Sequence, residues 1–121
     1  MNLKCCAHLG DAVYELFIRE KIIHLTSNLA KLHKINTDLV RASFQCDLLE
    51  NLEPHLSEEE KDLVRRGRNL PSSSSRRTNQ SLHRLATGFE VLIGHLHLYN
   101  KKRLEEIFEL IETHLSISNA Y

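Results

Sequence analysis

The sequence predicts an all-α protein folded as a single domain. Only two prolines and four glycines interrupt its 121 residues. Apolar residues recur with the 3.6-residue period of a helix, and no stretch shows the sustained alternation of a half-buried strand. A chain of this length is typical of one domain with its own core. We therefore expect one helical domain over residues 1–121.

The first predicted helix runs from about Cys6 to Leu25 and has two different faces. One face is an apolar stripe made by Leu9, Ala12, Val13, Leu16 and Phe17. The other face mixes acids with isoleucines and consists of Asp11, Glu15, Ile18 and Ile22. Because both faces hold apolar residues, we expect neighbours to pack on both sides of this helix.

A second helical stretch is expected from roughly Ser27 to Leu52, with an interruption near Asn36. Its end is predicted at Pro54, because proline lacks the N–H that a helix interior needs. Its buried side is predicted to hold Leu39, Val40, Ala42, Phe44, Leu48, Leu49 and Leu52.

Ser57 and Glu60 have the spacing of a capping box, in which each side chain satisfies the backbone N–H of the other residue. They predict a short helix that ends near Arg66, with Gly67 as its C-terminal cap. Residues 69–79 contain a proline and four serines and are predicted to form a loop.

Two more helices are expected at about Gln80 to Tyr99 and Lys102 to Leu115. The first has a broad apolar stripe of Leu82, Leu85, Ala86, Phe89, Leu92, Ile93 and Leu96. Beside that stripe run His83, Thr87, Glu90, Gly94 and His97. The second helix is predicted to bury Leu104, Ile107, Phe108, Ile111 and Leu115, and to expose its glutamates.

The net charge of zero hides a basic stretch, residues 63–89, which we call the basic segment. It contains no Asp or Glu, whereas the rest of the chain has ten Lys and Arg residues against sixteen acids. Its cations are all arginines, which favour two-pronged contacts with phosphate. From composition alone, phosphate binding and a solvated polar loop both remain open.

Composition also disfavours several function classes. No apolar run approaches the roughly 20 residues of a membrane span. The N-terminus lacks the apolar region of a secretion signal, so we expect an intracellular protein. Three cysteines in that setting argue against a disulfide framework. His83 and His97 lie too far apart along one helix to share a metal, which disfavours a zinc site.

Asp11 and Glu90 are the carboxylates that most suggest chemistry. Gly10 and Ala12 flank Asp11, and Gly94 follows Glu90 by one turn. Small residues let helices approach closely, so the two acids can meet, and they then repel unless a cation or proton separates them. Oxygen ligands suit Mg²⁺, which activates water for attack on phosphate. By periodicity alone, two solvated acids remain the simpler explanation.

The few aromatic residues bear on the kind of nucleic acid that could bind. Phe17, Phe44, Phe89 and Phe108 all fit core stripes. Binding of single-stranded RNA by stacking requires several exposed aromatic side chains. Recognition by shape and phosphate remains, and that is the mode suited to a duplex.

Four motifs, in order, carry a resemblance to a known family. HLGDAVYEL at residues 8–16 resembles the first signature of ribonuclease III-type nuclease domains, and LATGFEVLIGHLHL at residues 85–98 resembles the second. Between them lie KLHK at residues 31–34 and VRRGRN at residues 64–69. Together they cover nearly the whole chain and look like the Mini-III ribonuclease subfamily.

The resemblance implies an all-helical ribonuclease III-type endonuclease domain of about five to seven helices. It also implies a homodimer and Mg²⁺-dependent hydrolysis of double-stranded RNA to 5′-phosphate products, with Mn²⁺ as a substitute. The implied substrate is precursor ribosomal RNA of the large subunit, with a ribosomal protein as a candidate partner that presents it. The implied location is the cytoplasm, or the organellar stroma in a eukaryote. Mini-III enzymes lack a separate double-stranded-RNA-binding domain, and we expect none here.

The resemblance assigns the catalytic and metal-binding roles to Asp11 and Glu90. Two further acids of full-length ribonuclease III would fall at Ala7 and Thr87, and Mini-III enzymes share their absence. We expect one Mg²⁺ whose other ligands are water and RNA phosphate, and the number of metals stays open. Glu15 and Thr87 are candidate supports, although a surface or dimer-interface ion pair explains Glu15 equally well.

The basic segment matches the part of Mini-III enzymes that is expected to line the RNA groove. The predicted RNA-binding residues are Arg65, Arg66, Arg68, Asn69, Arg76, Arg77 and Arg84. The chain departs from the family after Asn69, where Leu70, Pro71 and four serines replace an expected basic residue. Arg76 and Arg77 are candidates to replace it, and substrate preference could differ accordingly.

The sequence leaves two alternatives to an active nuclease open. One is a catalytically weak or inactive ribonuclease III-like module that binds RNA or the ribosome, motivated by the missing acids at Ala7 and Thr87. The other is a helical interaction protein that dimerises through Ile18 and Ile22 and ignores both Mg²⁺ and RNA.

Overall fold

The computed structural model of the protein describes residues 2–71 and 80–118. Within these ranges the chain forms α-helices joined by short connections, with one 3-10 helix and no strand, which confirms the predicted all-α class. In order, the elements are α1 (Leu3–Ile22), α2 (Leu29–Val40), α3 (Ala42–Leu52), η1 (Glu53–His55), α4 (Glu58–Arg68), α5 (Gln80–Tyr99) and α6 (Lys101–Ser118).

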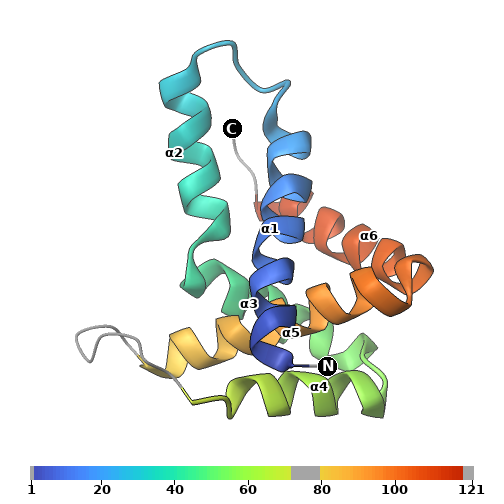
Figure 1. Ribbon diagram of the computed structural model, residues 1–121. Coiled ribbons are helices and arrows are strands. Elements are labelled where there is room, and N and C mark those ends of the chain that lie inside the picture. The colour runs from blue at the N-terminus through green and yellow to red at the C-terminus, as the bar shows by residue number, and fades with distance from the viewer. Residues whose placement is uncertain (1, 72–79, 119–121) are drawn as a thin grey trace.

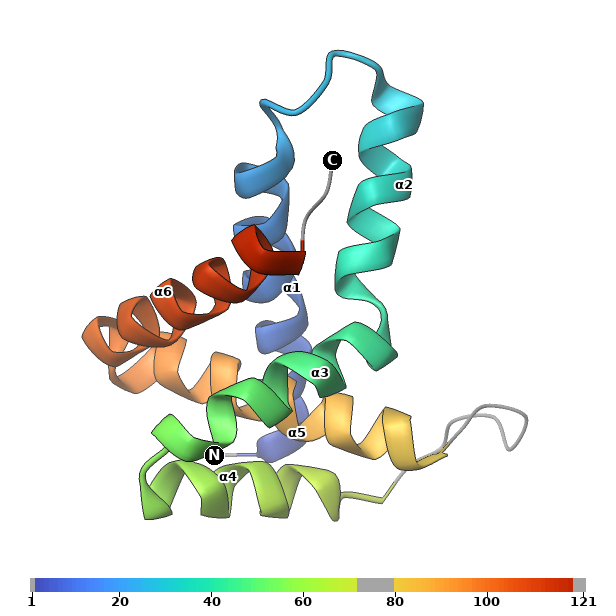
Figure 2. The same cartoon turned by 180° about the vertical axis from the view of Figure 1, so that it is seen from behind.

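Helix α5 is the centre of the domain and contacts α1, α3, α4 and α6. Figures 1 and 2 show α4 lying alongside α5 at the base of the molecule, while α1 crosses α5 and α2 stands beside α1. The C-terminal part of the chain returns as α6 against α3 and α5. None of the described helices is long and apolar enough to cross a membrane.

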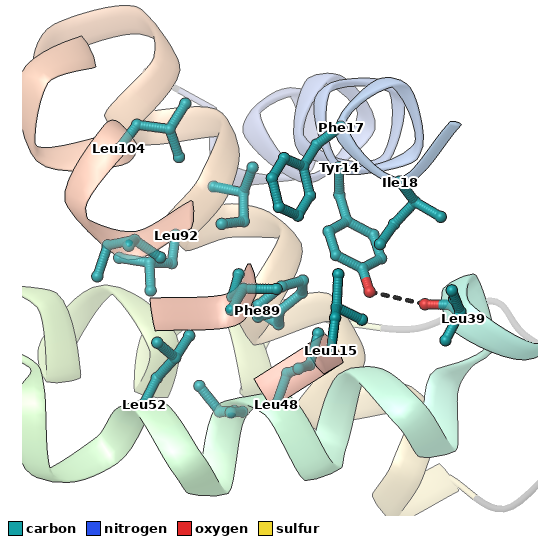
Figure 3. Packing of buried hydrophobic residues seen from close by; sticks show 14 of the residues in the cluster. Tyr14, Phe17, Ile18, Leu39, Leu48, Leu52, Phe89, Leu92, Leu104 and Leu115 are labelled. Carbon is teal, nitrogen blue, oxygen red and sulfur yellow. Dashed lines mark hydrogen bonds between the residues drawn. The ribbon is translucent and has the colours of Figure 1, made fainter. Parts of the chain in front are cut away.

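The core is built around aromatic residues of α1 and α5, drawn in Figure 3. The Tyr14 ring meets the Phe89 ring edge-to-face with centroids 5.1 Å apart, and Phe17 stacks on Phe108 at 4.1 Å. The buried Tyr14 hydroxyl donates a hydrogen bond of 2.6 Å to the Leu39 carbonyl at the end of α2. These contacts fasten α1 to α2, α5 and α6 in one core.

The predicted apolar stripe of the first helix was wrong by part of a turn. Leu16 is 59% exposed, whereas Tyr14 and Ile18 are completely buried. The buried residues of α1 are Cys6, Gly10, Tyr14, Phe17, Ile18 and Ile22. The reason is that α5 crosses α1 at Gly10, which carries no apolar side chain and gave no hydrophobic signal. Ile18 and Ile22 therefore belong to the core, and they do not form an exposed dimerisation face.

The second predicted helix is two helices, and the break lies at Arg41 instead of near Asn36. Arg41 has an extended backbone, with φ −68° and ψ 157°, so α2 ends at Val40 and α3 begins at Ala42. Two carbonyls at the end of α2 accept hydrogen bonds from side chains of other helices, namely Tyr14 of α1 and Gln45 of α3. These tertiary bonds stabilise the break.

The capping box that the sequence predicts at the start of α4 is present. The Glu60 backbone N–H donates to Ser57 Oγ at 3.1 Å, and the Ser57 N–H donates to Glu60 Oε1 at 2.8 Å. The same buried carboxylate of Glu60 accepts two hydrogen bonds from Arg103 of α6, at 2.8 and 2.9 Å. These contacts, foremost the bonds from Arg103, lower the pKa of Glu60.

Gly67 does not cap α4, which continues to Arg68 and has Asn69 as its cap. Gly67 is buried against α5 instead. A Cβ atom at this position would lie 2.8 Å from Val91 Cγ2 and 3.0 Å from the Cα of Gly88. Close packing of α4 on α5 therefore explains this glycine.

The two C-terminal helices agree well with prediction. Helix α5 has the predicted bounds, and α6 begins one residue earlier and ends three residues later than expected. Leu104, Ile107 and Ile111 are buried in α6, whereas its four glutamates are exposed. Clear amphipathic periodicity over long segments made these elements predictable.

Candidate active site

The candidate site lies where α1 crosses α5, and two glycines make this crossing unusually close. A Cβ atom on Gly10 would lie 1.9 Å from the Glu90 carbonyl oxygen, and one on Gly94 would lie 2.0 Å from the Cys6 carbonyl oxygen. Neither position has room for a side chain, so the two backbones are in direct contact. Asp11 follows Gly10, and this contact brings it beside Glu90.

The two carboxyl groups interact directly, and Glu90 is strongly perturbed. Its pKa is raised to about 8, first because the half-buried side chain has lost much of its water, and then because the Asp11 charge and a hydrogen bond with Asp11 favour the protonated form. Asp11 itself is exposed. The pair therefore combines one accessible acid with one withdrawn acid, and its fully ionised form is costly without a nearby cation.

Two buried amides, Gln45 and Asn36, interact with acids of α5 and α1 and were not predicted from the sequence. Gln45 Nε2 donates to the Val40 carbonyl at 2.8 Å, and the side chain also hydrogen-bonds with Glu90 in a way that lowers the Glu90 pKa. Asn36 Nδ2 lies 3.5 Å from Glu15 Oε2. The side-chain oxygens of both amides are buried and have no hydrogen-bond partner. The sequence offered one clue to them, namely a polar residue at a position where helical periodicity places a buried side chain.

The two candidate supports make local contacts. Glu15 forms an ion pair with Arg19 one turn further along α1, with Arg19 Nε 2.9 Å from Glu15 Oε2. The Thr87 hydroxyl donates to the His83 carbonyl of its own helix at 2.9 Å. Of the readings proposed for Glu15, the surface ion pair is present, and Asn36 links this glutamate to α2.

The donor set is compatible with a hard cation. Asp11 and Glu90 offer carboxylate oxygens, the ligand type that Mg²⁺ prefers, and Mg²⁺ commonly keeps several waters when only one or two carboxylates hold it. Within residues 2–71 and 80–118, no group of three or more His, Cys, Asp or Glu residues could hold a metal ion. The chemistry of the site thus fits one Mg²⁺ that is only partly enclosed by protein.

The described arginines of the basic segment lie at the end of α4 and the start of α5. Arg65 and Arg66 both approach Asp62, one turn earlier on α4, at the residue just before the segment begins. Arg68, Asn69 and Arg84 are exposed. Arg76 and Arg77 lie outside the described residues. The structure thus places exposed cations on two neighbouring helices, and the Asp62 carboxylate partly offsets the positive charge of Arg65 and Arg66.

Comparison with known proteins identifies the family. Residues 6–101, which include both signatures and all described arginines of the basic segment, match the family described as "Ribonuclease III domain".

This chain belongs to the ribonuclease III family.

Within the ribonuclease III family, its relatives include proteins named Mini-ribonuclease 3. The one from a Synechocystis species is 42% identical over 106 residues, which cover 88% of this chain and 74% of the relative. The Gloeobacter violaceus protein is 42% identical over 112 residues, covering 93% and 83%. The Clostridium tetani protein is 43% identical over 116 residues, covering 92% and 76%. The predicted resemblance to Mini-III ribonucleases is therefore confirmed.

A solved structure has the same fold as this chain. The crystal structure of protein FN1578 from Fusobacterium nucleatum superposes with a TM-score of 0.79 at 27% sequence identity. The match covers 90% of this chain and 89% of the other. The same arrangement of helices thus occurs in a protein with a considerably different sequence.

Proposed function

We propose that this protein is an endoribonuclease that cleaves double-stranded RNA with Mg²⁺ held by Asp11 and Glu90. The observation that carries the proposal is the juxtaposition of these two acids in a chain of the ribonuclease III family. Burial first, and the neighbouring Asp11 second, raise the Glu90 pKa to about 8. Mn²⁺, which also suits oxygen ligands, is expected to substitute for Mg²⁺.

The reaction is hydrolysis of a phosphodiester. A water oxygen forms a bond to phosphorus, the bond from phosphorus to the 3′ oxygen breaks, and the products carry a 5′-phosphate and a 3′-hydroxyl. When bound, Mg²⁺ supplies an activated water and neutralises charge on the phosphate. Asp11 presents its carboxylate at the surface, where RNA can reach it. Glu90 offers the second carboxylate for Mg²⁺ from the less exposed side of the site. The backbone contact at Gly10 holds the two in register.

Recognition of a duplex rests on the basic segment. Exposed arginines at the end of α4 and the start of α5 suit phosphates along an RNA backbone. Among the described residues, the exposed aromatic side chains are too few for a base-stacking platform. For Arg68→Ala we expect weaker binding to every duplex sequence, with the salt dependence reduced by about one phosphate contact. Titration of RNA at several salt concentrations measures this. An unchanged slope would remove Arg68 from the RNA surface.

We also propose a homodimer, formed through the outer face of α1. Ala12, Leu16 and Ile23 are exposed on this face, and Leu16 and Ile23 are each 59% exposed. Apolar side chains exposed along one helix face are typical of surfaces that a partner covers. Asp11 borders the same face, so two copies would hold two cleavage sites near one interface and could cut both strands. If sedimentation at micromolar concentration shows a monomer, the proposed homodimer is wrong.

The expected natural substrate is precursor RNA of the large ribosomal subunit, cleaved in the cytoplasm or an organellar stroma, with a ribosomal protein as a candidate partner. This part rests on the resemblance to Mini-III ribonucleases. Cleavage of a duplex from that precursor, compared with an unrelated duplex of equal length, tests it. Equal rates on both would remove the ribosomal preference.

The central experiment measures cleavage of labelled duplex RNA with Mg²⁺ and with chelator. Asp11→Asn and Glu90→Gln are expected to lower the rate by at least about a thousandfold while leaving folding and RNA binding intact, because each removes a charge that the cation requires. Glu105→Gln, which changes an exposed acid on α6, is the matched control and should cleave normally. Wild-type rates from either site variant would overturn the assignment. RNA binding without cleavage by the wild type would favour an inactive binding module.

A further inference from the structure

A groove between the start of α4 and the end of α5 has no role in the proposed cleavage site. It has a volume of about 450 Å³ and is lined by Glu58, Glu59, Asp62, Leu63, Arg66 and His95. Figures 1 and 2 show α4 alongside α5 at the base of the molecule, and the groove runs between these two helices. Of its lining residues, Arg66 alone is among those predicted to bind RNA.

An exposed aromatic side chain extends this groove at the end of α5. The Tyr99 ring is 59% exposed and lies against the ring of His95, with the two ring centroids 4.8 Å apart. The neighbouring Leu98 is 44% exposed. Apolar side chains exposed together are typical of surfaces that a partner covers, and the face of an aromatic ring attracts cations. The end of α5 therefore presents an aromatic surface that suits a cationic side chain.

The charge of the groove favours the same kind of ligand. Three acids line it against one arginine, Arg66, which lies 4.0 Å from one of those acids, Asp62. The Glu58 side chain is 93% exposed, and its ion pair with Lys61 is of the exposed kind that binds weakly. Glu59 is exposed and takes part in none of the ion pairs among the described residues. Phosphates of RNA or of a lipid surface would be repelled here, whereas a cationic segment would be attracted.

We propose that this groove binds an arginine-rich segment of a partner protein. One planar guanidinium can stack on the Tyr99 ring, while others donate paired hydrogen bonds to the carboxylates of Glu58 and Glu59. Lysine offers the charge without the plane and should bind less tightly. Because Arg66 lines the same groove, a segment bound here would lie beside RNA held by the basic segment. This inference goes beyond the proposed function and does not depend on cleavage.

The first measurement uses labelled oligo-arginine and oligo-lysine peptides of equal length with the RNA-free protein. In fluorescence anisotropy, oligo-arginine is expected to bind, and oligo-lysine to bind several-fold less tightly, because an ammonium group neither stacks nor pairs in two-pronged fashion. In NMR spectra recorded during the oligo-arginine titration, the backbone amide signals of residues 58–63 and 95–99 should shift most. No binding of oligo-arginine, equal binding of the two peptides, or shifts centred elsewhere would overturn the inference.

Single substitutions test the carboxylate and the ring separately. Glu59→Gln removes an acid and Tyr99→Ala removes the exposed ring, and each should weaken oligo-arginine binding roughly threefold, the size of one exposed charge or cation–π contact. Glu109→Gln on α6 and Leu29→Ala on α2 are the matched controls, because both residues are exposed and neither lines the groove. Both controls should keep the wild-type affinity. If the groove variants bind as tightly as the controls, the inference is wrong.

Two other occupants are tested with the double variant that combines Glu59→Gln and Tyr99→Ala. If the groove holds arginines of a second copy of this chain, the double variant sediments differently from the wild type. If the groove belongs to the RNA surface, the double variant binds duplex RNA with a different affinity. We expect both properties to stay the same, and a change in either would overturn the inference. Peptide binding at the groove by a wild type that fails to cleave RNA would support this inference while the proposed function fails.

Discussion

Glu60 and Glu90 are both acids that the fold withdraws from water, and their surroundings differ in one respect. Glu60 has a cation built into its site, because the Arg103 guanidinium donates two hydrogen bonds to its carboxylate. Its pKa is lowered accordingly. Glu90 faces another acid, Asp11, and its pKa is raised to about 8. None of the ion pairs among the described residues includes Asp11 or Glu90.

The difference separates a structural acid from a candidate catalytic one. A carboxylate whose charge is already balanced contributes to folding and has little left to offer a ligand. A carboxylate whose charge is left unbalanced weakens the fold and gains most from a cation that arrives from solution. Burial alone would not have distinguished the two residues, whereas the sign of the pKa shift does.

The largest expected effect comes from removing the cation that balances Glu60. Arg103→Met leaves a buried carboxylate without its partner and should reduce the free energy of unfolding by about 3–5 kcal/mol. Glu90→Gln, by contrast, should leave it unchanged or higher in metal-free buffer, because glutamine is neutral without the proton that Glu90 must take up on folding. Urea denaturation of both variants measures this. If Glu90→Gln destabilises the protein as much as Arg103→Met, the distinction fails.

An intermediate effect is expected from changing the helix crossing beneath Glu90. Gly10→Ala forces a methyl group against the Glu90 carbonyl, which as backbone cannot rotate away, and such overpacking costs about 1–3 kcal/mol. It should also lower the cleavage rate, because the two acids separate. A Cβ atom at Gly67 would meet its nearest atoms at 2.8 to 3.0 Å, farther than at Gly10, so Gly67→Ala should affect cleavage less. If the two variants cleave at equal rates, the close crossing of α1 and α5 does not control the placement of Asp11 and Glu90.

The smallest effects appear in the dependence of stability on pH. The Glu90 pKa of about 8 lies above its ordinary value, so the folded protein retains a proton that the unfolded chain has lost. Stability should therefore fall as pH rises from about 4.5 to 8 in metal-free buffer. The lowered pKa of Glu60 has the opposite sign, and its contribution is present above the ordinary carboxyl pKa and lost as pH falls.

Each part of this pH profile has its own control. Glu90→Gln should flatten the alkaline part, and Arg103→Met should flatten the acidic part, in denaturation curves recorded across the pH range. Mg²⁺ at ten times its dissociation constant should stabilise the wild type by about 1.4 kcal/mol and leave Glu90→Gln unaffected. An alkaline decline that persists in Glu90→Gln would assign it to another group.

The parts of the fold that could be predicted were those with strong periodicity. Helix α5 was predicted with its exact bounds, because a broad apolar stripe runs along its whole length. The buried side of α1 was missed because its centre is Gly10, whose role depends on how close another backbone comes. Gly67 was misread as a cap for the same reason. Tertiary contact, which periodicity does not encode, decided both positions.

The candidate site was predictable only in part. The motifs singled out Asp11 and Glu90, and the structure places them side by side, although their catalytic role stays a prediction. The association of Gln45 with Glu90 could not be read from spacing, because α3 and α5 are distant in sequence. Arg76 and Arg77 lie outside the described residues, so their part in RNA binding also stays a prediction.

The glycine contact between α1 and α5 has a consequence for how this protein could be altered. With no layer of side chains between the two helices, the separation of Asp11 and Glu90 depends on main-chain positions, which repacking elsewhere in the core changes little. The described arginines of the basic segment lie at the end of α4 and near the start of α5 and take no part in this contact. The RNA-contacting residues could therefore be varied to change which RNA is cleaved, while the separation of Asp11 and Glu90 stays the same.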